Sequence, residues 1–219
     1  MRKLAIMFMI AMLIMTSLTG CRANVPQDTT GQIMPSSTAP STSTTAPSST
    51  APSGTQNGNT DNATESVQIL SAIWNQYGEG DKFAAYGGAV DNAVDNAPGA
   101  LNMSDSEELT TRYLIPQDQL TAIRAGASLV HMMNNNIFTG VVVTLSENGD
   151  MKALYEAWRD TIQGNRWICG QPDRLLMASV DDTHLVMAFG STEAMNTFTG
   201  KLSAAHSGAK VLYNEAVVS

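Results

Sequence analysis

Cys169 is the residue of this chain best suited to nucleophilic chemistry. It stands in Trp167-Ile168-Cys169-Gly170, just after an expected helix, where a Cys-Gly pair can expose a thiol on a turn. A cysteine hydrolase also needs a histidine within hydrogen-bond reach of the sulfur and a group that orients it. His131, His184 and His206 are available, but their spacing selects no partner for the thiol. The alternative is a small buried thiol that packs between Trp167 and a sheet, as free cysteines commonly do.

The histidines and acidic residues form no recognisable metal-binding motif. His131 and His184 are expected in strands, and the sequence has no HxH, HExxH or CxxC spacing. Residues 91–96 contain two Asp-Asn pairs that could offer oxygen ligands to Ca²⁺, but their spacing differs from that of an EF-hand loop. We therefore predict no metal and no cofactor, and we expect ordinary hydrogen bonds to satisfy the histidines.

Two pairs of carboxylates have a spacing that acid–base catalysis could use. Glu107 is followed directly by Glu108, and Glu156 precedes Asp160 by one helical turn, on the face opposite Trp158. A carboxylate exposed to water has little reason for a raised pKa, so we assign no catalytic residue among them.

The three tryptophans could form a surface on which sugar rings stack. Trp74 and Trp158 fall on apolar helical stripes, which indicates core packing instead, whereas the role of Trp167 stays open. Gly87-Gly88 lacks the flanking strand and helix that a phosphate-binding loop needs. The folded part of the chain therefore offers no motif that defines an activity.

The most specific signal is Leu18-Thr19-Gly20-Cys21, at the end of an apolar N-terminal run. Arg2 and Lys3 precede an unbroken apolar stretch at residues 4–15, which is the layout of a secretory signal and is too short for a transmembrane helix. The four residues resemble the lipobox of bacterial lipoproteins. The resemblance implies that a peptidase removes residues 1–20, that the Cys21 thiol carries a diacylglycerol, and that the chain is lipid-anchored on the extracytoplasmic face of the cell membrane. The alternative is an ordinary signal peptide with an incidental Cys21.

Residues 21–61 are expected to form the lipidated cysteine and a disordered tether. Residues 36–41 recur unchanged as 48–53, and the stretch is rich in Ser, Thr and Pro but poor in large apolar residues. Such a segment buries too little apolar surface to offset the entropy lost on ordering. Loss of Arg2 and Lys3 with the leader changes the formal charge from −8 to −10. This acidic balance argues against nucleic acid as a partner.

Residues 62–219 are expected to form one globular α+β domain. A helix from Asn62 to Gly78 should bury Trp74, and shorter helices should follow Ser104 and Pro116, the last ending at Gly126. Two strand pairs (128–133 with 137–145, and 174–180 with 184–189) alternate with helices that begin after Asp150 and Ser191, and residues 210–218 close as a strand. This order predicts a mostly antiparallel sheet, built from two β-hairpins and a C-terminal strand, with helices packed on one face.

The whole layout is similar to that of small lipoproteins of Gram-positive bacteria with one C-terminal α+β domain. The resemblance implies location at the membrane through lipid on Cys21. The anchor, the long tether and the lack of a catalytic motif lead us to expect a non-enzymatic domain for binding or envelope assembly, with an envelope protein or a small ligand as partner. The alternative is an envelope hydrolase or thiol enzyme that uses Cys169. A deep pocket lined by Trp or Tyr would favour a small ligand, and an exposed apolar patch larger than a few hundred Å² would favour a protein partner.

Overall fold

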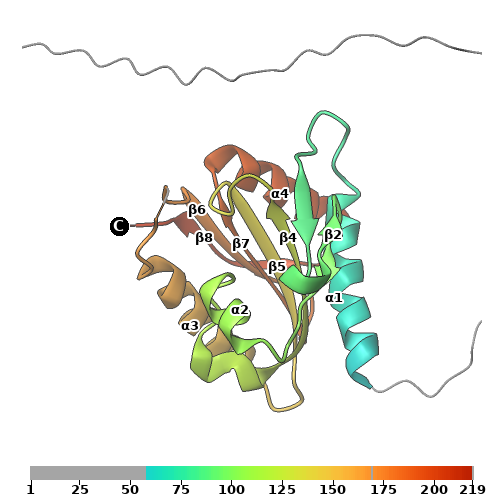
Figure 1. Cartoon of the computed structure of the whole chain (residues 1–219), viewed down its shortest axis with the longest axis vertical. Helices are drawn as coiled ribbons and strands as arrows, with labels where there is room; N and C mark the ends of the chain where they lie inside the picture. Colours follow the sequence, from blue (N-terminus) through green and yellow to red (C-terminus); the bar gives the residue numbers. More distant parts are fainter. Residues whose placement is uncertain (1–57, 169, 219) are drawn as a thin grey trace, which may run out of the picture. The chain divides into compact units, whose positions relative to one another are not determined.

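Residues 58–168 and 170–218 are described by the computed structural model (Figure 1). The signal peptide, the motif at 18–21, the tether up to residue 57 and Cys169 lie outside these residues, so the predictions made for them stay predictions. The elements are α1 (Gly58–Trp74), β1 (Ala85–Gly87), η1 (Val90–Asn92), β2 (Val94–Asp95), β3 (Gly99–Ala100), α2 (Ser106–Thr111), η2 (Gln117–Ala122), β4 (Ile123–His131), β5 (Phe138–Leu145), α3 (Met151–Gln163), β6 (Arg174–Ser179), β7 (His184–Gly190), α4 (Thr192–Ala205) and β8 (Lys210–Ala216). Within these ranges, no helix combines the length and the apolar character that crossing a bilayer requires.

The strands form one antiparallel sheet in the order β2-β1-β4-β5-β7-β6-β8, with β3 paired separately to β4. The two hairpins predicted from the sequence, β4–β5 and β6–β7, lie next to each other because β5 pairs with β7. α3 connects β5 to β6, and α4 connects β7 to β8, and each connection passes over one strand of the sheet. The predicted α+β class and the antiparallel sheet are confirmed.

Helices cover both faces of this sheet, whereas we predicted helices on one face (Figure 1). One core cluster joins Val141 and Val143 of β5 to side chains of α2 and α3, and the other joins Val142 to side chains of α1 and α4. Every residue of β5 is buried. Because neighbouring side chains of a strand point to opposite faces, a fully buried strand needs cover on both sides. The three consecutive valines already carried this signal in the sequence.

The predicted starts of the two long C-terminal helices are confirmed. The Asp150 carboxylate accepts hydrogen bonds from two backbone N–H groups in the first turn of α3, at 2.9 and 3.1 Å. The Ser191 hydroxyl accepts one from Ala194 in α4, at 3.3 Å. In both helices the cap satisfies donors that have no partner within the helix.

Three predicted helix boundaries are wrong. α1 begins at Gly58, so the predicted cap Asn62 lies inside the helix, and α2 is capped by Asp105 instead of Ser104. The helix expected after Pro116 is the short 3-10 turn η2, and the predicted stop, Gly126, lies within β4. Pairing of β4 with β5 extends the strand to Ile123, and this long-range pairing has no local signal.

Residues 79–103, which could have been helix or loop, form three short strands and the turn η1 at one side of the sheet. The backbones of Gly87 and Gly99 approach so closely that a Cβ on Gly87 would lie 2.5 Å from the Gly99 nitrogen and 2.3 Å from the Ser128 oxygen. Only glycine fits such an approach. The packing brings Tyr86 and Gly88 into contact with the side chains that follow α2.

Candidate functional site

Three neighbouring hollows lie where α2, the β4–β5 loop and the segment after α3 meet. The first has a volume of about 530 Å³ and the second about 250 Å³, and they share Thr111, Arg112 and Asn135. The third, of about 550 Å³, shares Arg166 and Trp167 with the second. The first and third have no lining residue in common, and we refer to the three adjacent hollows together as the Arg112 groove. It is lined by Val90, Asp105, Glu107, Glu108, Thr111, Arg112, Leu114, Asn135, Asn136, Gln163, Gly164, Asn165, Arg166, Trp167, Ile168, Gln171 and Phe189.

The helix α2 sets the first wall of the groove. Asp105 caps this helix by accepting a hydrogen bond from the Glu108 backbone at 2.9 Å. Glu108 and Arg112 are one turn apart, and Glu108 Oε1 lies 3.6 Å from Arg112 Nη1. The Glu108 carboxylate also accepts from the Val90 backbone N–H at 3.2 Å, which ties α2 to η1.

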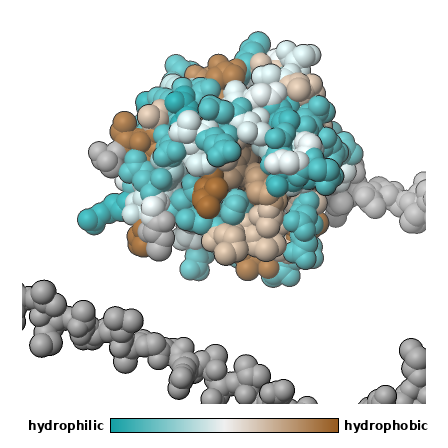
Figure 2. All heavy atoms as spheres, turned by 90° about the horizontal axis from the view of Figure 1, so that it is seen from above, coloured by the Kyte–Doolittle hydropathy of each residue, from teal (hydrophilic) through white to brown (hydrophobic). Residues whose placement is uncertain are grey.

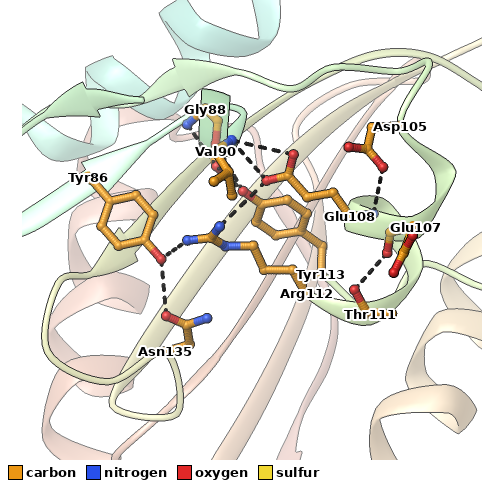
Figure 3. A network of polar contacts seen from close by, with 11 residues as sticks. Tyr86, Gly88, Val90, Asp105, Glu107, Glu108, Thr111, Arg112, Tyr113 and Asn135 are labelled. Carbon is orange, nitrogen blue, oxygen red and sulfur yellow. Dashed lines mark hydrogen bonds and ion pairs between the residues drawn. The ribbon is translucent and has the colours of Figure 1, made fainter. Parts of the chain in front are cut away.

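Arg112 lies at the centre of a polar network (Figure 3). Its guanidinium lies 4.8 Å from the centre of the Tyr86 ring, and its Nη2 donates to the Tyr86 hydroxyl. That hydroxyl donates to Asn135 Oδ1 at 3.1 Å. The network therefore joins β1, the end of α2 and the β4–β5 loop, and holds the Arg112 side chain in one orientation with 18% of its surface exposed.

A second, fully buried set of hydrogen bonds supports Arg112 from behind. The Tyr113 hydroxyl donates to the Gly88 carbonyl at 3.0 Å, and Ser128 Oγ accepts from the Gly88 N–H at 3.0 Å. Tyr113 and Ser128 are themselves 3.0 Å apart, so the three residues form a closed ring. Burial raises the pKa of the Tyr113 hydroxyl, which keeps it protonated as the donor this ring needs.

Backbone strain is located directly behind the groove. Leu114 adopts the left-handed conformation, with φ of +56°, and its side chain lines the second hollow. This conformation costs a residue with a side chain about 1–2 kcal/mol. The Leu114 side chain is buried in the core cluster below α2, which offsets that cost. This residue follows the end of α2, and the Ile115 N–H donates to the Leu109 carbonyl across the turn at 3.1 Å.

Two hydrogen-bond donors in the groove have no partner. Arg112 Nε and Trp167 Nε1 are buried and unpaired, and in the part of the chain that the structure describes, the other two side-chain atoms in this state are Arg124 Nε and His184 Nε2. The indole N–H groups of Trp74 and Trp158 donate to backbone carbonyls at 3.0 Å. Buried polar atoms without a partner are rare, and each costs about 1–3 kcal/mol. Two of them in one hollow mark it as a place where a hydrogen-bond acceptor is missing.

The charges of the groove are separated along its length. Asp105 and Glu107 line the first hollow, and Arg166 lines the second and third. The prediction that Glu107 and Glu108 both face solvent is wrong for Glu108, whose side chain is 11% exposed. Burial raises the pKa of the Glu108 carboxyl. By contrast, Glu156 and Asp160 have side chains that are 47% and 73% exposed, as expected.

The three histidines do not come together. His131 stacks on Phe83 at 5.2 Å, and its Nδ1 accepts from a backbone N–H. His184 Nδ1 lies 2.8 Å from Asp181 Oδ2, in the turn predicted for Asp181, and His206 Nε2 lies 3.1 Å from the Ile69 carbonyl oxygen. Among residues 58–168 and 170–218, no group of three or more His, Cys, Asp and Glu side chains is arranged to hold a metal ion.

Sequence reasoning missed the residues that build the groove. Trp167 was left open, and Tyr86, Arg112 and Asn135 carried no signal because each is an ordinary residue until the fold brings them together. Cys169 itself lies outside the described residues, so the thiol-enzyme alternative stays a prediction. The carbonyls of its neighbours Ile168 and Gly170 both accept hydrogen bonds from the Asn136 side chain.

Glu108→Gln is expected to change how stability depends on pH. Because burial raises the folded-state pKa of Glu108, the folded protein binds more protons than the unfolded chain just above the ordinary glutamate range. The wild-type free energy of unfolding should therefore fall as pH rises through that interval, and the variant should lack this fall. Urea unfolding at a series of pH values measures the free energy of unfolding of both proteins. If the wild type became more stable relative to the variant as pH rises, the raised folded-state pKa of Glu108 would be contradicted.

Comparison with protein-family models, curated proteins and solved structures finds no match for this chain, so its site is interpreted from its own geometry.

Proposed function

We propose that this chain is a lipid-anchored extracytoplasmic protein whose domain binds a small ligand in the Arg112 groove. The observation that carries the binding proposal is the pair of buried donors, Arg112 Nε and Trp167 Nε1, which have no partner and line the same hollow. Both nitrogens are closed to water in this structure, so a ligand with hydrogen-bond acceptors would reach them by displacing the groups that cover them, and it would then remove the cost of leaving them unpaired.

The construction of the groove supports binding over catalysis. Arg112 is held by Glu108, Tyr86 and its stacking contact, so its orientation is set before a ligand arrives. A guanidinium stays protonated throughout the physiological pH range, so it donates hydrogen bonds but does not shuttle protons. Such a fixed donor suits recognition of acceptor groups.

The surface supports a small ligand over a protein partner. The large apolar side chains exposed by more than one third in the described chain are Val90, Val94, Met132, Met133, Ile137, Ile168, Val211 and Val218. On the face seen in Figure 2, the most apolar residues (brown) lie apart from one another, and a paler apolar group extends from the centre to the lower edge. Trp167 lines the groove, which fits the aromatic part of the criterion for a small ligand, but the hollows are open to solvent and not deep.

The anchor part of the proposal rests on the sequence at Leu18-Thr19-Gly20-Cys21 and on the Ser/Thr/Pro-rich residues that follow. Two or more acyl chains hold a protein at a bilayer stably, because each buried CH₂ contributes about 0.8 kcal/mol. A membrane-held domain with an open groove would capture its ligand outside the cytoplasm.

The binding proposal is tested by thermal unfolding of the full-length protein in detergent micelles. We expect at least one of short peptides, uronic acids, dicarboxylates and inorganic phosphate to raise the unfolding temperature of the wild type. Trp167→Phe keeps an aromatic ring against Phe189, 5.2 Å away, but removes the indole N–H, so it should lose most of that rise. Glu156→Gln, on the exposed face of α3, is the control and should respond like the wild type.

A result against the proposal would be that no compound class stabilises the wild type. Equal stabilisation of the wild type and Trp167→Phe would also contradict it, because the unpaired indole would then have no part in binding.

A further inference from the structure

We propose that His184 is a pH-dependent clasp that fastens α1, the first helix of the domain, to the sheet. The protonated ring is held by two carboxylates, Asp181 in the β6–β7 turn and Glu65 in α1, whereas the neutral ring keeps only its bond to Asp181. This device is separate from the Arg112 groove and needs no ligand there.

The His184 ring is buried between two carboxylates, one at each of its nitrogens. Its side chain is 9% exposed, Nδ1 lies 2.8 Å from Asp181 Oδ2, and Nε2 lies 3.7 Å from Glu65 Oε2. Both carboxylate side chains are about half exposed, so the ring is enclosed while its two partners reach solvent.

The bond to Asp181 fixes which ring nitrogen carries the proton. The Asp181 carboxylate also accepts from the Thr183 N–H at 2.7 Å and from the His184 N–H at 2.8 Å. Burial works against ionisation of Asp181, but the hydrogen bonds from Thr183 and His184 outweigh it and lower the pKa of this carboxyl. Because an ionised carboxylate can only accept, Nδ1 must be the donor, which leaves Nε2 of the neutral ring without a proton.

A second proton therefore changes what His184 can do toward α1. Nε2 is buried and has no hydrogen-bond partner among the described residues. In the neutral ring, Nε2 and the Glu65 carboxylate are two acceptors that face each other without a bond. A proton on Nε2 turns it into a charged donor, and an approach of less than about 1 Å would complete a hydrogen bond to Glu65.

The clasp lies beside a contact that does not depend on pH. Ser66 follows Glu65 in α1, and its hydroxyl lies 2.7 Å from that of Thr144 on β5. Thr144 is directly opposite His184 in the pairing of β5 with β7. Two consecutive residues of α1 are thus placed over two paired residues of the sheet, and only the His184 link responds to protonation.

The other charged groups at this end of the sheet do not offer the ring an alternative partner. Asp182, in the same turn, is exposed. The cations Arg124 on β4 and Lys210 on β8 are each separated from β7 by one strand. The position of β5 that faces His184 is the uncharged Thr144.

Urea unfolding of the full-length protein in detergent micelles, with Glu65→Gln beside the wild type, tests the clasp. At about pH 5 a histidine is protonated and carboxylates are mostly ionised, so the wild type should have an unfolding equilibrium constant about threefold smaller than the variant. At about pH 8 the introduced amide can donate to the neutral Nε2, so the variant should be at least as stable as the wild type. Groups that titrate elsewhere are present in both proteins and cancel in the comparison.

Glu156→Gln is the matched control. Glu156 Oε1 lies 3.7 Å from Lys152 Nζ, the same distance as in the clasp, but lysine does not titrate between these pH values. The effect of this substitution should be the same at both. A ratio of wild type to Glu65→Gln that is also the same at both would overturn the proposal.

The imidazole ¹⁵N signals of the full-length protein give a direct readout of the ring. At about pH 8 the His184 signals, identified by their loss in His184→Gln, should show the proton on Nδ1. A neutral ring with its proton on Nε2 would already donate toward Glu65, and the proposal would be wrong.

Hydrogen exchange shows whether the clasp acts on α1. At about pH 5, Glu65→Gln should lower the protection of the α1 amides about threefold and leave the α3 amides unchanged. Equal changes in both helices would mean that Glu65 affects the whole domain instead of fastening α1.

Discussion

Replacing Cys21 with serine is expected to move the protein from the membrane fraction to the soluble fraction of cells. The lipid is proposed to be attached to the Cys21 sulfur, and a serine hydroxyl does not replace the thiol in that reaction. Each acyl chain contributes about 0.8 kcal/mol per buried CH₂, so loss of the chains removes essentially all membrane affinity. Immunoblots of separated fractions, together with incorporation of a labelled fatty acid, measure the effect.

The matched control for this experiment is Cys169→Ser, the substitution of the second of the two cysteines. This variant should stay in the membrane fraction and incorporate label like the wild type. Label in the Cys21→Ser protein, or wild-type protein found mainly in the soluble fraction, would show that the lipobox resemblance does not hold for this chain.

Trp158→Ala is expected to destabilise the domain by about 5 kcal/mol. The Trp158 side chain is completely buried between α3 and the sheet, and removal of a buried tryptophan costs about 3–5 kcal/mol. Its Nε1 donates to the Tyr113 carbonyl at 3.0 Å, and leaving that carbonyl without a donor costs about 1–3 kcal/mol more. Domains of this size are stable by about 5–15 kcal/mol, so this change removes between one third and all of the stability.

Urea unfolding of the variant series measures this cost. Trp158→Phe keeps most of the ring volume but removes the N–H, so it should cost about 2 kcal/mol. Lys152→Ala, on the same helix with 70% of its side chain exposed, should change stability by less than about 0.5 kcal/mol. A Trp158→Ala protein as stable as Lys152→Ala would mean that α3 does not pack on the sheet as described.

The sequence predicted the elements whose signals are local. Asp150 before an amphipathic stretch placed α3, and continuous apolar runs separated by turn residues placed the hairpins that became β4–β5 and β6–β7. It did not predict that helices cover both faces, because which helix crosses which face depends on the pairing of β5 with β7, between residues forty or more positions apart.

The groove was beyond sequence reasoning for the same reason. Tyr86, Arg112 and Asn135 come from three separate segments, and their contacts exist only after β1 has paired with β4 and α2 has docked. Glu108 was grouped with the carboxylates expected to be exposed to water and was therefore given no catalytic role. The contact of its carboxylate with Val90, in the neighbouring turn η1, is what takes it out of water.

The position of α1 decides how the domain would respond to mechanical force. The polypeptide enters the domain through this helix, which packs against β4 and β5 on the face that it shares with α4, whereas α2, α3 and the groove occupy the opposite face. Tension applied from the N-terminal side would therefore load the contact between α1 and the sheet first, including the buried hydrogen bond between Ser66 and Thr144. The walls of the groove would carry load only after that contact had yielded. Tension on the tether would therefore leave a bound ligand undisturbed.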